Sequence, residues 1–250
     1  MTVSVGVIVA LAGAAFVAGV IDAIAGGGGL ITVPALLAAG LPPHVALGTN
    51  KGQSVFGSAS ALIAFARRGA LDRKLAPKTF PAGLLGSLCG AAAVLALPPS
   101  ILRPVILILL PVAAAAVLIK RPVGDGTAPR NAILKAVALA AVIGAYDGFF
   151  GPGTGTFLIV GFVILNHMPL VNASANAKVV NFASNLAAVG IFASRGVILW
   201  KIALPMAAGQ LAGGWTGAHL AVKGGEKVIR GAVVLVVMGL VVKLATDLLR

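Results

Sequence analysis

Long runs of apolar residues, separated by short polar segments, dominate the pattern of this chain. A helix of roughly 20 apolar residues is long enough to cross about 30 Å of hydrocarbon. The pattern therefore predicts an all-α fold, a polytopic transmembrane helix bundle with about eight spans. The apolar runs cover approximately residues 4–40, 44–66, 79–97, 101–119, 131–166, 172–194, 199–222 and 228–249.

Two of the runs, 4–40 and 131–166, are too long for one straight span and contain many glycines. The first is interrupted by glycines at 26–29 and the second by the glycine-rich segment 151–155. A helix rises about 1.5 Å per residue, so ~36 residues in one helix would extend ~54 Å. We expect each of these helices to break, bend or re-enter the membrane.

Composition agrees with a membrane location. Hydrophobic residues make up 59% of the 250 residues, charged residues only 10%, and the mean hydropathy is +1.07. A soluble domain carries about 25% charged residues, so this chain lacks the polar surface to face water on all sides. The net charge of +13 lies in short clusters between apolar runs and forms no basic face with interleaved aromatics. We therefore expect a lipid bilayer, and no nucleic acid, as its surroundings.

Basic residues on the segments 67–78 and 120–135 indicate an orientation. Two apolar runs separate these segments, so both lie on one side, which the positive-inside rule makes cytoplasmic. Counting one crossing for each run then places both termini in the cytoplasm. Lys223 and Lys227 disagree with this count, because it leaves them outside.

The two halves of the chain repeat a common pattern. Residues 19–22 match residues 144–147 with an offset of 125 (147 − 22). Residues 46–51 match residues 173–178 with an offset of 127 (178 − 51), and this second offset then persists without a gap. A shared register over this length predicts duplication of one four-helix unit.

Duplication divides the chain into a first transmembrane repeat at 1–119, a hydrophilic linker at 120–130 and a second repeat at 131–250. Internal symmetry is common in secondary transporters, whose sites lie at the repeat interface near mid-membrane. Four spans per unit would make the copies parallel. A re-entrant hairpin at each glycine break would make them inverted, and the sequence leaves both arrangements open.

Four charged residues lie within or beside the apolar runs, and all four are paired by the repeat: Asp22 with Asp147, and Lys51 with Lys178. A charge at the centre of a bilayer costs at least ~2.5–3.5 kcal/mol, so it usually faces a cavity or a partner. We favour a polar cavity in which the two aspartates serve in proton coupling. Structural salt bridges and snorkelling at the headgroup level are the alternatives.

Polar residues follow each lysine at the spacing i, i+3, i+7, which places them on one helix face. The two stripes are Lys51–Ser54–Ser58 and Lys178–Asn181–Asn185, with Asn50, Gln53 and Asn176 beside them. Matching stripes from equivalent helices favour a lined pathway that binds a substrate. Hydrogen bonding between helices, which Ser and Asn often provide in membranes, is the alternative.

The glycine breaks add candidate backbone donors. A helix that restarts after such a break directs its N-terminal N–H groups and positive dipole end toward the gap. Gly27 and Gly28 in the first break, and Gly153 and Thr154 in the second, are the candidates. Lysine together with a helix N-terminus suits an oxyanion. Packing or kinking of the helices is the alternative, and a phosphate-binding loop is excluded because Gly-Lys-Ser/Thr is absent.

The remaining motifs favour structure over chemistry. Glycines spaced by four, at 209–217 and 86–90, predict close helix contacts. The three histidines are scattered and Cys89 is the only cysteine, so we expect no metal site, disulfide or cofactor. No nucleophile–base pair has a recognisable spacing, so we expect no enzyme.

The motifs at 19–29 (GVIDAIAGGGG), 46–51 (ALGTNK) and 146–155 (YDGFFGPGTG) resemble those of the TauE/SafE sulfite exporter family, also called the toluene-sulfonate uptake permease family. Residues 172–178 (NASANAK) and 181–185 (NFASN) extend the resemblance over nearly the whole chain. It implies an eight-helix protein of the inner membrane of a prokaryote, with duplicated halves. It also implies movement of sulfite, sulfonates or related sulfur-containing anions.

These observations lead to a hypothesis of a secondary carrier for sulfite or an organosulfonate. The lysines would counter the anion's charge, the Ser and Asn side chains would bond its oxygens, and the aspartates would orient the lysines or carry a coupled proton. A passive anion channel and a non-transporting membrane scaffold are the alternatives. The partner is then a small anion, and a homo-oligomer is possible.

Overall fold

The computed structural model describes residues 4–117 and 124–248, and it describes side chains there except at 103, 116–117 and 225–248. The described residues form nine α-helices and no strand, as the sequence predicted for the fold class. The first part of the linker and Lys227 lie outside the described side chains. The helices are α1 (Val5–Ala25), α2 (Gly29–Ala38), α3 (Pro43–Arg67), α4 (Ala76–Ala96), α5 (Pro99–Val117), α6 (Ala132–Phe149), α7 (Thr154–Asn166), α8 (Leu170–Ser194) and α9 (Trp200–Leu248).

Each over-long apolar run becomes a helix followed by a shorter return helix. α1 ends at Gly26, whose φ of 81° lies in the left-handed region and whose N–H donates to the carbonyls of Ile21 and Asp22. The second run turns at Gly151 and Gly153, with φ of 97° and 85°. Glycine adopts these angles without a steric penalty. The breaks therefore produce two hairpins, α1–α2 and α6–α7.

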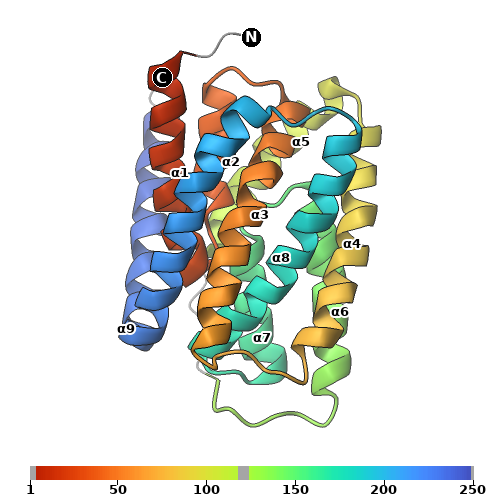
Figure 1. Cartoon of the computed structure of the whole chain (residues 1–250), viewed down its shortest axis with the longest axis vertical. Coiled ribbons are helices and arrows are strands. Elements are labelled where there is room, and N and C mark those ends of the chain that lie inside the picture. Colours follow the sequence, from red (N-terminus) through yellow and green to blue (C-terminus); the bar gives the residue numbers. More distant parts are fainter. Residues whose placement is uncertain (1–3, 118–123, 249–250) are drawn as a thin grey trace.

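The two hairpins enter the bundle from opposite ends. The first half of α1 packs with the end of α2 and the start of α9 in one apolar cluster at the upper end. The start of α6 instead packs with the end of α7 and the start of α8 at the lower end (Figure 1). The helices of the second half therefore run in the opposite sense to their counterparts in the first half.

This course changes the side on which the chain ends lie. The parity count from the sequence took 4–40 and 131–166 as single crossings, whereas α2 and α7 return the chain to the end from which it came. The loop after α3 therefore lies at the lower end, while α1 begins and α9 ends at the upper end (Figure 1). Lys223, which conflicted with the count, lies near the lower end with Val222, which packs in the same cluster as Ala70.

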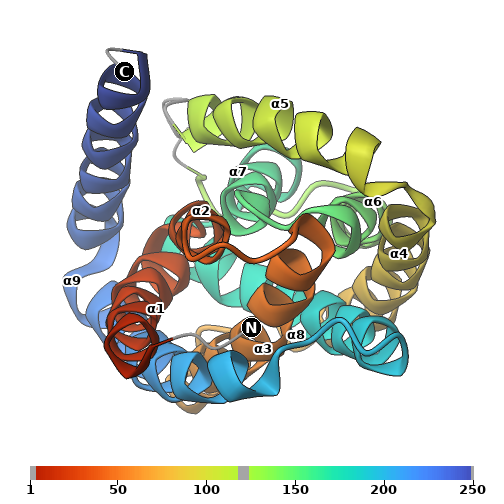
Figure 2. The same ribbon diagram turned by 90° about the horizontal axis from the view of Figure 1, so that it is seen from above.

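α3 and α8 cross the middle of the bundle, between α1 and α9 on one side and α4 and α6 on the other (Figures 1 and 2). The runs predicted at 199–222 and 228–249 are joined in α9, which passes down one side of the bundle and turns back in its second half. α8 is the most buried of the four helices that are long and apolar enough to cross a membrane. A substrate site surrounded by protein is therefore most easily built on α3 and α8.

The predicted glycine contacts join the two halves. Gly86 and Gly90 on α4 abut the carbonyls of Ala141 and Ala145 on α6, so closely that an added Cβ would overlap them. Gly213 and Gly217 on α9 abut the carbonyls of Phe16 and Val20 on α1 in the same way. Close approach of helices through glycine is the usual source of helix association in membranes, where lipid is as apolar as leucine. Each half thus packs its fourth helix against the first helix of the other half.

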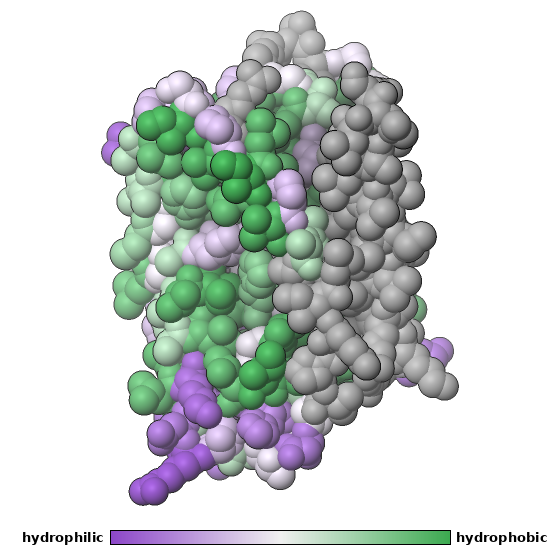
Figure 3. Space-filling view, turned by 180° about the vertical axis from the view of Figure 1, so that it is seen from behind, coloured by the Kyte–Doolittle hydropathy of each residue, from purple (hydrophilic) through white to green (hydrophobic). Residues whose placement is uncertain are grey.

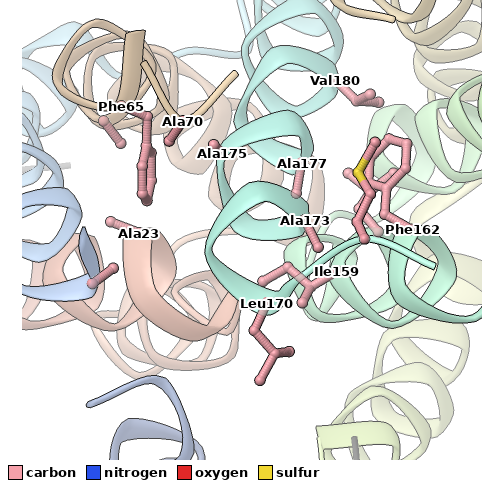
Figure 4. Packing of buried hydrophobic residues seen from close by; sticks show 14 of the residues in the cluster. Ala23, Phe65, Ala70, Ile159, Phe162, Leu170, Ala173, Ala175, Ala177 and Val180 are labelled. Carbon is pink, nitrogen blue, oxygen red and sulfur yellow. The ribbon is translucent and has the colours of Figure 1, made fainter. Parts of the chain in front are cut away.

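Apolar side chains both fill the interior and cover the outside. Phe65, Ile159 and Phe162 pack with the alanines of α8 in the largest buried cluster (Figure 4). On the outside, Ile108 and Leu134 are 65% and 69% exposed. Figure 3 shows apolar residues over much of one face and hydrophilic residues gathered at the lower end. A surface of this kind matches lipid around the middle and water at the lower end.

Candidate functional site

Two ion pairs lie in the middle of the bundle. Lys51 Nζ on α3 lies 2.7 Å from Asp147 Oδ1 on α6, and Lys178 Nζ on α8 lies 2.6 Å from Asp22 Oδ2 on α1. The lysine side chains are 2% and 0% exposed. Each pair joins one half of the chain to the other, so that the four charged residues singled out in the sequence are brought together across the two halves.

The position of each aspartate explains why it needs a cationic partner. Asp22 and Asp147 lie in the last turns of α1 and α6, where the helix dipole presents its negative end. A carboxylate there is unfavourable unless donors face it from elsewhere. The lysines supply one donor each, and the starts of the return helices supply others: Gly28 N lies 3.3 Å from Asp22, and Thr154 Oγ1 lies 2.9 Å from Asp147.

Asp147 sits in a fully protein-lined environment. Besides Lys51 and Thr154, it accepts a hydrogen bond from Ser184 Oγ on α8. Lys51 in turn donates to Asn185 Oδ1 at 3.1 Å. Because removal of one partner of a buried pair leaves an uncompensated charge, we expect this group of side chains to be held as a unit.

Asp22 has fewer partners. Its described donors are Lys178 and the backbone of Gly28, and its side chain is 24% exposed. Lys178 has no described acceptor other than Asp22. This second pair is therefore bound less tightly to its surroundings than the first.

A small cavity of about 30 Å³ lies between the pairs. One water molecule needs roughly 10–15 Å³ on the same measure, so the cavity holds about two water molecules or a group of similar size. The return helices, the lysine-bearing helices and α9 all contribute to its wall. Its lining residues are Asp22, Gly28, Gly29, Asn50, Lys51, Ser54, Asp147, Gly151, Thr154, Gly155, Asn181, Asn185 and Gln210.

Most of the site residues that the sequence predicted lie on this wall or contact it. Lys178 lies behind Asp22, to which it is bonded, and Ser58 lies behind Asn185, whose Nδ2 is 3.4 Å from Ser58 Oγ. Gly27 and Gly153 belong to the breaks but are not among the lining residues. Asn176 lies elsewhere: its amide bonds the backbone of Asp72 and Asn172 near the lower end.

Two polar residues of the site were not singled out in the sequence. Gln210 on α9 lines the cavity, and Ser184 on α8 bonds Asp147. Gln210 has no polar counterpart in the first half, where residue 83 is glycine, so a search for repeated polar positions passes over it. Ser184 lies between Asn181 and Asn185 on the same helix, and the i, i+3, i+7 spacing from Lys178 does not include it.

One amide on the cavity wall has an unpaired atom. Asn181 Oδ1 is buried and has no hydrogen-bond partner. Buried polar atoms are paired in the great majority of cases, so an unpaired amide beside a cavity is suited to a ligand or to water. Among the side chains that the structure describes, no three of His, Cys, Asp or Glu gather as metal ligands do.

Comparisons with known proteins agree with these features. A sequence model of the family described as sulfite exporter TauE/SafE matches residues 11–244. A probable membrane transporter protein, ORF9, of a Sinorhizobium species is 41% identical over 94% of this chain and 90% of its own length. Probable membrane transporter proteins of Haemophilus influenzae and Escherichia coli K12, the latter called YfcA, are 38% and 37% identical over 93% of this chain and 92% and 87% of their own lengths. No solved structure matches. The chain therefore belongs to the TauE/SafE sulfite exporter family of membrane transporters.

Proposed function

We propose that this protein is a secondary transporter of a small sulfur-containing oxyanion, sulfite or an organosulfonate, and that transport is coupled to protons. The observation that carries the proposal is the pair of buried lysines, each bonded to an aspartate of the other half, around a small polar cavity. The family name supplies the substrate class, and the chemistry of the cavity is compatible with it.

The cavity offers donors of the kind that an oxyanion needs. Lys51 supplies a positive charge and Ser54 supplies a hydroxyl, and Gly28 and Gly29 at the start of α2 line the same space. Hydrogen bonds to a charged acceptor are about twice as strong as neutral ones. A small anion would therefore exchange its hydration shell for fixed donors of similar strength.

The charge balance of the site supports coupling. Two lysines and two aspartates together are neutral, so a bound singly charged anion, a sulfonate or hydrogen sulfite, adds one uncompensated negative charge in a region of low dielectric constant. Uncompensated charge is expensive in such a region. A proton taken up by an aspartate restores neutrality, which links anion binding to proton binding.

The arrangement of the halves supports a carrier. We propose that the two halves are inverted copies of one unit, because corresponding helices run in opposite directions and corresponding contacts recur at offsets of 125 and 127 residues. Inverted repeats allow alternating access, in which the two halves rock around a central site. The cavity of about 30 Å³ corresponds to a stage of such a cycle in which the central site is contracted.

We further propose that the lower end faces the cytoplasm. The described basic residues of the segment 67–78 lie there with Arg130, Lys135 and Lys223, whereas Arg195 and Lys201 are at the upper end. The positive-inside rule places the more basic end in the cytoplasm. Both chain ends then lie on the outer side of the inner membrane.

The decisive experiment measures radiolabelled sulfite flux into proteoliposomes with and without an imposed proton gradient. Wild type is compared with Lys51→Ala/Lys178→Ala, and with Lys223→Ala as the control for loss of an exposed lysine. We expect gradient-dependent flux in wild type and Lys223→Ala, and none in the double variant. Equal flux without a gradient would indicate a channel. A folded wild type that moves no sulfite, with or without a gradient, would contradict the proposal and return the ion pairs to a scaffold role.

A further inference from the structure

The two ion pairs occupy corresponding positions but have different surroundings. Asp147 accepts hydrogen bonds from three side chains, those of Lys51, Thr154 and Ser184, and is 5% exposed. Asp22 accepts from one side chain and one backbone N–H, and is 24% exposed. Each carboxylate has one lysine partner at nearly the same distance. The two pairs therefore differ in the other hydrogen-bond donors around each carboxylate and in its exposure.

The sequence accounts for this difference at two positions. Thr154 corresponds to Gly29 at the offset of 125 residues, and Ser184 corresponds to Gly57 at the offset of 127. Neither glycine has a hydroxyl to offer to Asp22. The space beside Gly57 is instead filled by the amide of Gln210, which an added Cβ at that position would meet. The first half thus lacks both hydroxyl donors that hold the carboxylate of the second half.

Hydrogen bonds to an ionised carboxylate favour its charged form, and their absence makes protonation easier. A carboxylate that carries a proton across a membrane must also be reached by water. Asp22 meets both requirements better than Asp147, because it has fewer donors and a larger exposed fraction. Asp22 also lies between the cavity and Lys178, since Asp22 lines the cavity and Lys178 does not.

We infer that Asp22 alone carries the coupled proton, and that its protonation releases Lys178 to the anion. This inference rests on the proposed function. The proton binds to the Asp22 carboxylate, which becomes neutral and gives up its ion pair with Lys178. The freed ammonium group then pairs with the anion that enters the cavity. Asp147 and Lys51 stay ionised and keep the second pair closed, so one proton accompanies each anion in the same direction.

The groups that face Asp22 agree with a single titrating site. Lys178 on α8 bonds it, and Lys51 on α3 and Asp147 on α6 line the same cavity. Among the lining residues, α2, α7 and α9 contribute only glycines, Thr154 and Gln210, none of which titrates. Protonation of Asp22 leaves two lysines and one aspartate ionised. The site then carries the positive charge that an anion requires.

Infrared difference spectroscopy on the full chain in lipid nanodiscs tests the inference, with sodium sulfite as the probe. We expect sulfite to produce the carbonyl band of a protonated carboxylic acid in wild type. The Asp22→Asn variant should lack the band, Asp22→Glu should shift its frequency, and Asp147→Glu should leave it where it is. A band that persists unchanged in Asp22→Asn, or that moves in Asp147→Glu, would overturn the inference.

Proton uptake in weakly buffered solution gives the stoichiometry. Because sulfite itself takes up a proton near neutral pH, the measured quantity is the difference between wild type and Asp22→Asn at the same pH. We expect wild type to take up about one proton more for each sulfite bound, which corresponds to an additional tenfold loss of affinity for each unit rise in pH. Equal uptake would overturn the inference while leaving sulfite transport intact. A wild type that neither binds nor moves sulfite would instead reject the proposed function.

If Asp22→Asn does not fold, Asp22→Glu decides, because it keeps an acidic group and the shift of its band identifies the protonated residue. A merely structural role for Asp22 would alter stability without moving an anion-induced band.

Discussion

The hairpins α1–α2 and α6–α7 follow the same backbone course with different chemistry. Both have an aspartate in the last turn of the first helix and a glycine with left-handed backbone angles after that helix. This glycine is Gly26 in the first hairpin and Gly151 in the second. In the second hairpin, Tyr146 Oη donates to the carbonyl of Pro152 at 2.7 Å and Thr154 donates to Asp147. The first hairpin has four consecutive glycines at 26–29, and no side chain of α2 donates to Asp22; Thr32 on α2 instead donates to Asn50 Oδ1 on α3 at 2.6 Å.

The two hairpins therefore share a backbone course without sharing the side-chain hydrogen bonds that hold it. The α6–α7 hairpin is fixed by its own side chains, so it suits the role of a stationary wall. The α1–α2 hairpin is held mainly by contacts to other helices: Lys178 bonds Asp22, Thr156 Oγ1 donates to the Ala25 carbonyl at 2.8 Å, and Thr32 bonds Asn50. Its backbone also meets that of α7 at Gly26, where Thr156 N donates to the Gly26 carbonyl at 3.2 Å. Because Asp22 has fewer hydrogen-bond donors than Asp147, fewer bonds oppose a change in its protonation state.

The largest effect is expected from removal of the lysines one at a time. Lys51→Ala leaves Asp147 buried without its counter-ion, which costs about 3–5 kcal/mol of stability for a buried pair. Lys178→Ala should cost less, because the side chain of Asp22 is 24% exposed and can be hydrated. Thermal unfolding in detergent measures both. If Lys178→Ala is the more destabilising variant, the two pairs do not differ as described.

Substitution at the backbone crossing should have the next largest effect. Gly26→Ala places a methyl group against Gly155 and Thr156 and forces alanine to a φ of 81°. Overlap with backbone cannot be relieved by a side-chain rotation, so we expect a reduced yield of folded protein in size-exclusion chromatography.

Gly40→Ala is the matched control for this substitution. Gly40 has a φ of 85° and no atom within 4 Å of an added Cβ, so it isolates the backbone strain, about 1–2 kcal/mol. Equal yields of the two variants would show that the crossing is not tightly packed.

Removal of the hydroxyls that bond Asp147 should make the surroundings of Asp147 more like those of Asp22. A hydrogen bond to a charged group contributes about 1.5–3 kcal/mol, so Thr154→Val and Ser184→Ala should each destabilise the protein by an amount of that order. The double variant should also acquire a second proton per sulfite, because Asp147 then resembles Asp22. Proton uptake that stays at one in the double variant would show that these hydroxyls do not separate the two carboxylates.

The smallest effect is expected at Asn176, which lies near the lower end and does not line the cavity. Asn176→Ala removes two hydrogen bonds to backbone near residues 72 and 172 and should change stability by about 1 kcal/mol without changing the affinity for sulfite. Asn185→Ala removes the same amide from the same helix at a residue that lines the cavity, so it should weaken sulfite uptake. An equal loss of affinity in both variants would extend the site beyond the cavity.

The sequence was sufficient for much of the helical pattern. The runs at 44–66, 79–97 and 172–194 correspond to α3, α4 and α8 within a few residues, because apolar length alone identifies such helices. The glycine breaks were also identified from composition. The direction of the chain after each break was not, because glycine permits a bend, a kink or a full return equally well. The parity count, which depends on that direction, therefore placed the chain ends with the segment 67–78, whereas in the structure they lie at the opposite end of the bundle (Figure 1).

The site was predictable as a set of residues but not as a set of pairs. Helical spacing placed Lys51 with Ser54, and the repeat matched Lys51 to Lys178. Which aspartate faces which lysine depends on how α4 and α9 pack across the halves through their glycines, and the sequence of one half carries no information on that contact. Gln210 and Ser184 were missed for the same reason, since tertiary packing brings them to the cavity and to Asp147.

Binding of sulfite to the central site is the central claim, and thermal stabilisation of the purified protein by sulfite measures it most directly. A ligand at 100 times its dissociation constant stabilises the folded state by about 2.7 kcal/mol. We predict that sulfite raises the unfolding temperature of wild type and of Lys223→Ala at constant ionic strength, and that it does not raise that of Lys178→Ala. The same rise in all three proteins would mean that sulfite binds elsewhere and would contradict the assignment of the cavity.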